Sequence, residues 1–460
     1  MTGSFFEATR VGWPFFVGGG DGRAREVSVG ETVAVAGTAA VREMVAECGR
    51  AILFTNFMEQ LATVLVRPGE ADRLIAGHPW LYQGSILRIT AAVADGAVVQ
   101  VKDHRQRFLG VGFYNSKSKI AVRMLAPDRV EVNEKFFAER IRAALALRTR
   151  YMPGASSFRV VNSEGDLLSG LIVDKYEDVL VLQTSSLGMD QRKGMILAVL
   201  QELFAPRAIL ERNDMASRRF EGLPEAQGTI VGEAPGPVGV KLNGLEFKLD
   251  LATGHKTGLY LDQQENYQRV AELVKTTNAK QVLDCFSFLG GFALHAARAG
   301  AERVLGLDQS AEAVAAATQN AAANGLAERC TFEAVNVFDW LKAQTVPAPH
   351  EKVVPRFDFI VLDPPSFTRN RDSVPDALRG YKEIHLRALK LLRAGGTLAT
   401  FCCSHHVDSN LFLDSILAAA YDCHRVLRRV AVFHQAPDHP VLPSVAETEY
   451  LKGFAFEIAR

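Results

Sequence analysis

The chain has 460 residues, of which 48% are hydrophobic and 23% are charged. This composition is typical of a globular protein with more than one domain. Lys plus Arg and Asp plus Glu both number 52, so nucleic-acid binding through overall charge is disfavoured and would need local basic patches. No stretch approaches the roughly 20 apolar residues of a membrane span, and the six cysteines lack framework spacing, so we expect a cytoplasmic protein with no membrane partner.

The first 57 residues differ from the rest of the chain. They contain a glycine-rich turn, VGGGDG (17–22), and show little periodicity and no signal-peptide order. Met58 then opens MEQLATVLVRPGEADRL, which is typical of a natural chain start. We therefore expect residues 1–57 to be a poorly ordered extension, and hypothesise that a misassigned start codon adds them. A full-length intact mass for the native protein would contradict that hypothesis.

Short segments of alternating hydrophobicity fill residues 58–132, with Gly, Asp and Pro between them. This pattern predicts a small β-barrel or sandwich. The segments are ATVLVR, GSILRIT, AVVQVKD, RFLGVGFY and KIAVRML.

Residues 133–240 combine helical and strand patterns. Asn133 is placed to cap a helix over 133–150. The strand-like VLVLQTS and the helical DQRKGMILAVLQELF follow, before Gly- and Pro-rich connections. We predict an α+β middle module.

From residue 241 the pattern changes to apolar runs that alternate with alanine-rich helices. One such helix has Ser310 as its N-cap and Gly325 beyond its end. This alternation predicts a parallel sheet covered on both faces, so residues 241–460 are expected to form a doubly wound α/β domain. The runs are VLDCF (282–286), RVLGLD (303–308), TFEAVN (331–336), FDFIVLD (357–363) and TLATFCC (397–403).

Acidic residues end the first two runs, and ligands of doubly wound sheets bind beyond the carboxyl ends of strands. Asp284 precedes Gly290 and Gly291 at the start of a helix, and Asp308 ends the second run. Either aspartate alone could be a turn or cap residue, but the pair favours a ribose-containing cofactor. The first loop lacks the GxGxxG series that binds a pyrophosphate. S-adenosylmethionine is therefore predicted, rather than a nicotinamide dinucleotide.

Asp363 ends the fourth run, within VLDPPSFTRNR (361–371). The two prolines that follow stop the strand and stiffen the turn, because each fixes φ and removes a donor. Phe367 is then available to stack on a base, and Arg369 and Arg371 to contact phosphate. Alternatively, Asp-Pro-Pro is only a turn and the arginines belong to a solvated face.

The fifth run ends in FCCSHHV (401–407), which is rich in reactive side chains. Neighbouring strand residues face opposite ways, so Cys402 and His406 cannot easily converge with Cys403 and His405 on one ion, and no metal is expected. Cys402 is expected in the core. Cys403 ends its strand beside the expected end of the Asp363 strand, which suggests a nucleophile.

From about residue 62 to 460 the sequence resembles the large-subunit ribosomal RNA cytosine-C5 methyltransferases. These enzymes join an N-terminal PUA domain to a class I S-adenosylmethionine-dependent domain. The resemblance implies a PUA-like RNA-binding domain over 58–132, a methyltransferase domain over 241–460 and large-subunit ribosomal RNA as partner. The motifs that carry it are GHPWLYQGSI (77–86), VNSEGDLLSGLIVDKY (161–176), TGHKTGLYLDQQEN (253–266), LDCFSFLGGFALHAA (283–297), LDPPSF (362–367), ALRGYKEIHLRALKLLRAGG (377–396) and HQAPDHPVLPSVAETEYLKG (434–453).

The resemblance also implies roles for single residues. Cys403 would add to C6 of a cytosine so that C5 can accept the methyl group, while Asp363 would hydrogen-bond the cytosine near N3. Asp308 would bind the ribose hydroxyls, and Asn336 would lie beside the adenine. The residues that match the first cofactor loop are Asp284, Phe286, Ser287, Gly290 and Gly291.

Three positions depart from patterns common among such enzymes. Ser366 stands where many RNA cytosine-C5 methyltransferases have a second cysteine for product release, which leaves the releasing base unidentified; His405 and His406 are candidates. Asn336 replaces an aspartate and would rely on its amide oxygen. His255 replaces a glutamine, and a core role is favoured for it.

The segment around His78, Pro79, Trp80 and Tyr82 suggests RNA contact by stacking and shape. Alternatively, Trp80 and Tyr82 close the base of the barrel. Both interpretations stay open.

Two other functions compete with cytosine-C5 methylation. Methylation of a base nitrogen typically uses Asn/Asp-Pro-Pro followed directly by an aromatic residue, whereas Ser366 here precedes Phe367. A ribosome-assembly factor that binds RNA without catalysis is the other alternative, and the intact cofactor loop argues against it. A homodimer is a further expectation that the sequence does not decide.

Overall fold

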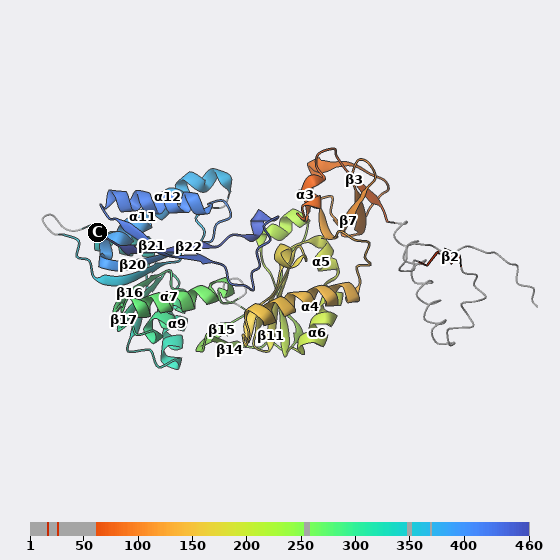
Figure 1. The fold of residues 1–460 in the computed structure, drawn as a ribbon. Helices are drawn as coiled ribbons and strands as arrows, with labels where there is room; N and C mark the ends of the chain where they lie inside the picture. Colours follow the sequence, from red (N-terminus) through yellow and green to blue (C-terminus); the bar gives the residue numbers. More distant parts are fainter. Residues whose placement is uncertain are drawn as a thin grey trace, which may run out of the picture. The chain divides into compact units, whose positions relative to one another are not determined.

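The computed structural model describes residues 61–252, 258–346, 352–368 and 370–459, together with two short strands near the N-terminus (Figure 1). The chain divides into two compact units, Met1–Leu61 and Ala62–Arg460. In the first unit, β1 (Phe16–Val17) pairs antiparallel with β2 (Arg25–Glu26). The prediction for residues 1–57 otherwise lies outside the described residues.

A six-stranded sheet opens the second unit and includes all five predicted strands. Its core is made of inward side chains such as Val64, Val101 and Val122, each fully buried. The sheet also contains β4, which the sequence pattern missed because the strand has only three residues. In spatial order the strands are β4 (Trp80–Tyr82), β8 (Ile120–Ala126), β7 (Phe108–Tyr114), β6 (Val98–Lys102), β3 (Thr63–Val66) and β5 (Ile86–Ile89), and α3 (Asp72–Ile75) follows β3.

The middle module is a five-stranded mixed sheet with helices, as predicted. Asn133 caps the first helix by accepting a hydrogen bond from Phe136 N over 3.1 Å. The strand order is β13 (Ala226–Gly232), β12 (Ala208–Asn213), β11 (Val179–Thr184), β10 (Leu171–Tyr176) and β9 (Ser157–Asn162). The helices are α4 (Glu134–Tyr151), α5 (Leu187–Gln191) and α6 (Lys193–Phe204).

A β-hairpin joins this module to the C-terminal domain. Side chains alternate between buried and exposed along β14 (Pro237–Leu242) and β15 (Leu245–Asp250). The buried ones share a hydrophobic core with the C-terminal domain. The expected boundary between residues 240 and 241 falls inside β14.

The C-terminal domain is the predicted doubly wound α/β fold, built on a seven-stranded sheet. The first five strands pair in parallel, and β22 runs antiparallel to both of its neighbours. In spatial order they are β18 (Cys330–Ala334), β17 (Arg303–Asp308), β16 (Gln281–Cys285), β19 (Phe357–Leu362), β20 (Leu392–Cys402), β22 (Lys452–Ile458) and β21 (Leu427–His434).

Helices cover both faces of this sheet. One core contains side chains of α7 (Gln264–Thr276), α8 (Gly291–Arg298) and α9 (Ala311–Ala323). The other contains those of α10 (Val337–Thr345), α11 (Val374–Leu391) and α12 (Ser409–Asp422). Figure 1 shows α11 and α12 on the opposite side of the sheet from α7 and α9. Within the described part of the chain, no helix has both the length and the apolar character needed to cross a membrane.

Candidate active site

The predicted strand-end residues lie along one edge of the sheet. Asp284 is in β16, Asp308 ends β17, Asp363 follows β19 and Cys403 follows β20. These four strands are adjacent and parallel. Their carboxyl ends therefore meet, which is where ligands of doubly wound sheets bind.

The loop after β16 has an unusual backbone. Phe286 and Phe288 have φ values of 66° and 48°, and Gly290 has 85°. Left-handed conformations are strained for aromatic residues, and such strain concentrates at functional sites. A Cβ on Gly291 would lie 2.6 Å from the ring of Tyr267, so the first turn of α8 requires glycine there.

Two buried polar atoms in this loop region have no hydrogen-bond partner among the described residues. Asp284 Oδ2 accepts a hydrogen bond from Ala293 N at 2.9 Å, but its Oδ1 is unpartnered, as is Ser287 Oγ. Burial raises the pKa of Asp284 well above the ordinary value, and the Asp363 and Asp308 charges add to the effect. Such atoms suit a positively charged, hydrogen-bonding ligand. The ammonium group of S-adenosylmethionine meets that requirement.

Asp308 and Asn336 both hold backbone amides. Asp308 accepts hydrogen bonds from Phe288 N and Ser310 N, each at 2.9 Å. Asn336 caps α10 by accepting from Phe338 N at 3.0 Å and from a second amide. Because the Asn336 amide oxygen already serves as cap, an adenine contact is better made by its amide nitrogen than by the oxygen expected from the sequence.

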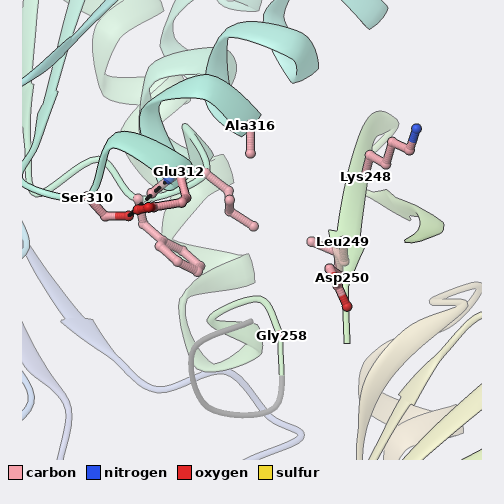
Figure 2. A pocket seen from close by; sticks show the side chains of 10 residues that line it. Lys248, Leu249, Asp250, Gly258, Ser310, Glu312 and Ala316 are labelled. Carbon is pink, nitrogen blue, oxygen red and sulfur yellow. Dashed lines mark hydrogen bonds between the residues drawn. The ribbon is translucent and has the colours of Figure 1, made fainter. Parts of the chain in front are cut away.

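A cavity of about 430 Å³ borders the Asp308 loop (Figure 2). Phe288 and Ser310, whose amides bind Asp308, are part of its wall. Figure 2 shows β15, which carries Lys248 and Asp250, across this space from Glu312 and Ala316 on α9. The cavity therefore provides room beside the carboxylate that is expected to bind ribose.

Asp363 is held by an amide that the sequence pattern did not single out. Gln263 Nε2 donates to Asp363 Oδ1 over 3.1 Å, and Asn266 Nδ2 donates to Gln263 Oε1 over 2.7 Å. The pKa of Tyr260 is raised by burial and by the negative charges of Asp363 and, more weakly, Cys403. Asp363 and Cys403 are therefore both close enough to Tyr260 for their charges to act on its hydroxyl.

The two neighbouring cysteines differ in exposure. Cys402 is fully buried, and burial raises its pKa. Cys403 is partly exposed, and its thiol lies 3.9 Å from the carbonyl oxygen of Pro364, the residue after Asp363. Among the residues that the structure describes, no group of three metal-binding side chains is present. The stretch thus contains one accessible thiol, beside Asp363.

The residues predicted to bind RNA make internal contacts where they are described. His78 is 3% exposed and lies 3.2 Å from Glu447, while the Trp80 indole nitrogen donates to Glu164 over 2.9 Å. The ring of Phe367 packs 4.6 Å from that of Tyr381. For Trp80 the contact with Glu164 favours the structural alternative, and RNA contact by His78, Trp80 and Phe367 stays a prediction. Arg369 and His255 lie outside the described residues.

Comparison with known proteins decides the family. Residues 217–456 match the S-adenosylmethionine-dependent methyltransferase model, and residues 64–127 match a PUA-like domain. The chain belongs to the S-adenosylmethionine-dependent methyltransferase family. Its cofactor is S-adenosylmethionine, as predicted.

Curated relatives of this methyltransferase align over nearly their whole length. Ribosomal RNA large subunit methyltransferase I of Klebsiella pneumoniae is 36% identical over 86% of this chain and 98% of the relative. The protein of that name from Shewanella amazonensis is 37% identical over 86% of the chain and 99% of the relative. A solved structure from Streptococcus mutans, assigned as a methyltransferase dependent on the same cofactor, has a TM-score of 0.72. It is 20% identical and covers 86% of this chain and 100% of its own, so it shows the fold alone.

Proposed function

We propose that this methyltransferase transfers a methyl group to C5 of a cytosine in large-subunit ribosomal RNA, through a covalent bond to Cys403. The observation that carries the proposal is the position of the Cys403 thiol, 3.9 Å from the residue that follows Asp363. The curated relatives, named for large-subunit ribosomal RNA, support this substrate. Ribosomal RNA as substrate also supports the cytoplasm as the compartment.

Cysteine chemistry is needed because C5 of cytosine is a poor nucleophile. The thiolate sulfur of Cys403 forms a bond to C6, and the C5–C6 double bond opens to place electron density on C5. Asp363, held by Gln263, hydrogen-bonds the cytosine near N3 and stabilises the base as its charge changes. Once C5 has taken the methyl group that bound S-adenosylmethionine would supply, a base removes the C5 proton and the C5–C6 double bond re-forms. The bond from sulfur to C6 then breaks, and its electron pair returns to the Cys403 sulfur.

The cofactor would be held along the ends of β16 and β17. When bound, S-adenosylmethionine supplies an electrophilic methyl group. Asp284 and Ser287 offer buried, unpartnered oxygens for its charged end, and Gly290 and Gly291 allow close approach of the loop. Asp308 would accept the ribose hydroxyl protons, and Asn336 would lie beside the adenine.

His405 is our candidate for the base that removes the C5 proton. It lies two residues after Cys403, and its ring packs 5.4 Å from that of Tyr450. Its pKa is lowered by loss of hydration, then by the positive charge of Lys452 and by His406. An imidazole with a lowered pKa is uncharged at neutral pH and can accept a proton.

Mapping of methylated cytosines in large-subunit ribosomal RNA tests the proposal. A strain that lacks the gene should lose one methylated cytosine, and a plasmid copy with Cys402→Ala should restore it. A copy with Cys403→Ala should not. An unchanged map in the deletion strain, or restoration by Cys403→Ala, would overturn the proposal; full turnover by Cys403→Ala would favour methylation of a base nitrogen.

The remaining proposals concern assembly. We keep the homodimer as a proposal, and sedimentation of the purified protein tests it directly. If the protein neither bound S-adenosylmethionine nor methylated RNA, that result would instead support a ribosome-assembly factor without catalytic activity.

A further inference from the structure

Strand β20, the last of the parallel strands, pairs with β22. Strand β22 begins with a buried lysine. Lys452 is 6% exposed. Its Nζ donates hydrogen bonds to the carbonyl oxygens of Ser404 and Val407, both over 2.6 Å. These carbonyls belong to the loop that directly follows Cys403. One ammonium group therefore ties both ends of that loop to β22.

The backbone on either side of Cys403 is fixed as a result. Before it, Cys402 pairs with Lys452 in the β20–β22 ladder. After it, Lys452 holds Ser404 O, while the Ser404 hydroxyl contacts the hydroxyl of Thr368 in the loop that begins at Asp363. The Cys403 thiol is thus positioned from two sides relative to the Asp363 loop.

Lys452 is also a buried charge of an uncommon kind. Its two recorded hydrogen-bond acceptors are carbonyl oxygens, and within the described ranges it forms no ion pair with a carboxylate. Burial lowers the pKa of Lys452, and nearby negative charge at Cys402, Cys403, Glu449 or Asp408 would raise it. A buried cation is costly unless a negative charge lies near it. A thiolate at Cys402 or Cys403 would add to the negative charge of Glu449 and Asp408, and Cys403 is the partly exposed thiol of the two.

We propose that Lys452 is a positioning residue that fixes the loop after Cys403 and stabilises the thiolate form of this cysteine. The catalytic role of Lys452 rests on the proposed function, whereas its effect on the Cys403 thiol does not. When the thiolate forms, the S–H bond breaks, the proton passes to water, and the electron pair stays on sulfur. The thiol then no longer donates to Pro364 O, and the nearby ammonium offsets the new charge.

Other charged and titratable groups also surround Cys403. The negative charge of Asp363 opposes thiolate formation, whereas a protonated histidine in the following loop would favour it. These groups are Asp363 after β19, Tyr260 before α7, Tyr381 on α11, Lys452 on β22, Cys402 on β20, and His405 and His406 in the following loop. Lys452 is the one among them that combines a buried positive charge with direct hydrogen bonds to the loop.

The rate at which iodoacetamide alkylates Cys403, measured across pH by peptide mass spectrometry, tests the inference. The full-length protein is compared with Lys452→Met and Lys452→Arg. We expect Lys452→Met to slow Cys403 alkylation at neutral pH by about tenfold or more and to move its midpoint to higher pH, and Lys452→Arg to restore most of the difference. The pH profile of kcat should shift in the same direction, with KM for the cofactor unchanged.

Lys175→Met is a matched control. Lys175 is also partly buried, its Nζ donates to the carbonyl oxygen of Ser156 over 2.8 Å, and burial lowers its pKa. It lies in the middle module, on β10. Its substitution should lower stability without moving the alkylation midpoint of Cys403. An equal shift in both lysine variants, or no shift in Lys452→Met, would overturn the inference.

The unsubstituted protein gives a second test, which does not depend on how the variants fold. Cys423 is a partly exposed thiol on the segment after α12, and burial raises its pKa. Cys403 should be alkylated with a midpoint at lower pH than Cys423, and the opposite order would contradict the inference. Loss of turnover in Cys403→Ala with no effect of Lys452→Met would overturn only the lysine inference, whereas full turnover in Cys403→Ala would overturn only the proposed function.

Discussion

Gln263 Nε2 donates a hydrogen bond to Asp363 Oδ1 across 3.1 Å, and Gln263 is itself 3% exposed. Asn266 fixes the orientation of this amide, because its Nδ2 donates to Gln263 Oε1 and to the carbonyl oxygen of His434. The Asp363 carboxylate therefore does not turn freely. Its orientation is fixed by two side-chain amides, those of Gln263 and Asn266, which precede β16 in sequence.

Gln263→Ala should impair turnover more than binding. Loss of a hydrogen bond to a charged group costs about 1.5–3 kcal/mol, so we expect kcat to fall by roughly 10- to 100-fold. Affinity for S-adenosylmethionine, measured by calorimetry, should change little. Gln268→Ala, an exposed substitution on α7, the helix that begins directly after Gln263, is the control. Equal losses in the two variants would exclude a role for the Gln263–Asp363 contact.

Asp284→Asn should stabilise the protein without its cofactor while weakening cofactor binding. Because burial raises the Asp284 pKa, the folded state holds this proton over a pH range in which the unfolded chain has released it. The Asp284 contribution to folding stability therefore falls as pH rises from the ordinary aspartate range through the raised value. Asparagine does not ionise, so the Asp284→Asn variant does not lose folding stability in this way as pH rises.

Thermal melts across pH and calorimetry check that expectation. Without cofactor, Asp284→Asn should melt at a higher temperature than the unsubstituted protein at neutral pH, and the difference should shrink in acid. Its affinity for S-adenosylmethionine should fall about tenfold or more, from the loss of a charged hydrogen bond. Asp414→Asn, on the exposed face of α12, should show neither effect. Unchanged affinity in Asp284→Asn would remove this residue from the cofactor site.

Trp80→Phe separates the two interpretations of the Trp80 side chain. Phenylalanine keeps a ring but loses the indole N–H that binds Glu164. We expect the free energy of unfolding to fall by about 1–2 kcal/mol, with RNA affinity within about twofold of the unsubstituted value. Tyr82→Phe on the same strand is the control. A large loss of RNA affinity with unchanged stability would instead establish Trp80 as an RNA contact.

His405→Gln should block release of the product rather than formation of the covalent bond. The imidazole is active when uncharged, so activity should fall as pH drops through the His405 pKa, which lies below its ordinary value of 6.5. The acidic limb of the pH–rate profile should therefore lie at a pH below 6.5. In His405→Gln, the protein–RNA adduct should accumulate on denaturing gels, whereas His406→Gln should release product normally. Accumulation in neither variant would assign the base elsewhere.

The strand-end residues could be predicted because alternating strands and helices determine where ligands bind. Asp284, Asp308, Asp363 and Cys403 each lie in or at the end of a recognisable apolar run, and parallel pairing brings those ends together. The Ser310 cap was predicted for the same kind of local reason, and its hydroxyl accepts from Ala313 N. Local patterns were sufficient for these parts of the fold.

Gln263 and Lys452 could not be found in that way. Gln263 precedes β16, the first strand of the sheet in sequence, and Lys452 begins β22, which a long connection joins to β21. Their contacts, with Asp363 and Ser404, span 100 and 48 positions in sequence. From sequence alone, a lysine at the start of a strand is usually expected to be exposed to solvent. Only the antiparallel insertion of β22 beside β20 buries it.

The central claim, covalent catalysis by Cys403, is tested most directly with large-subunit ribosomal RNA that contains 5-fluorocytidine. Fluorine at C5 cannot leave as the proton does, so the bond between sulfur and C6 should persist after methyl transfer. We predict a denaturation-resistant protein–RNA adduct in the presence of S-adenosylmethionine, located on the peptide that contains Cys403. It should form with Cys402→Ala and not with Cys403→Ala. An adduct located elsewhere, or methylation of unmodified RNA by Cys403→Ala, would contradict the account.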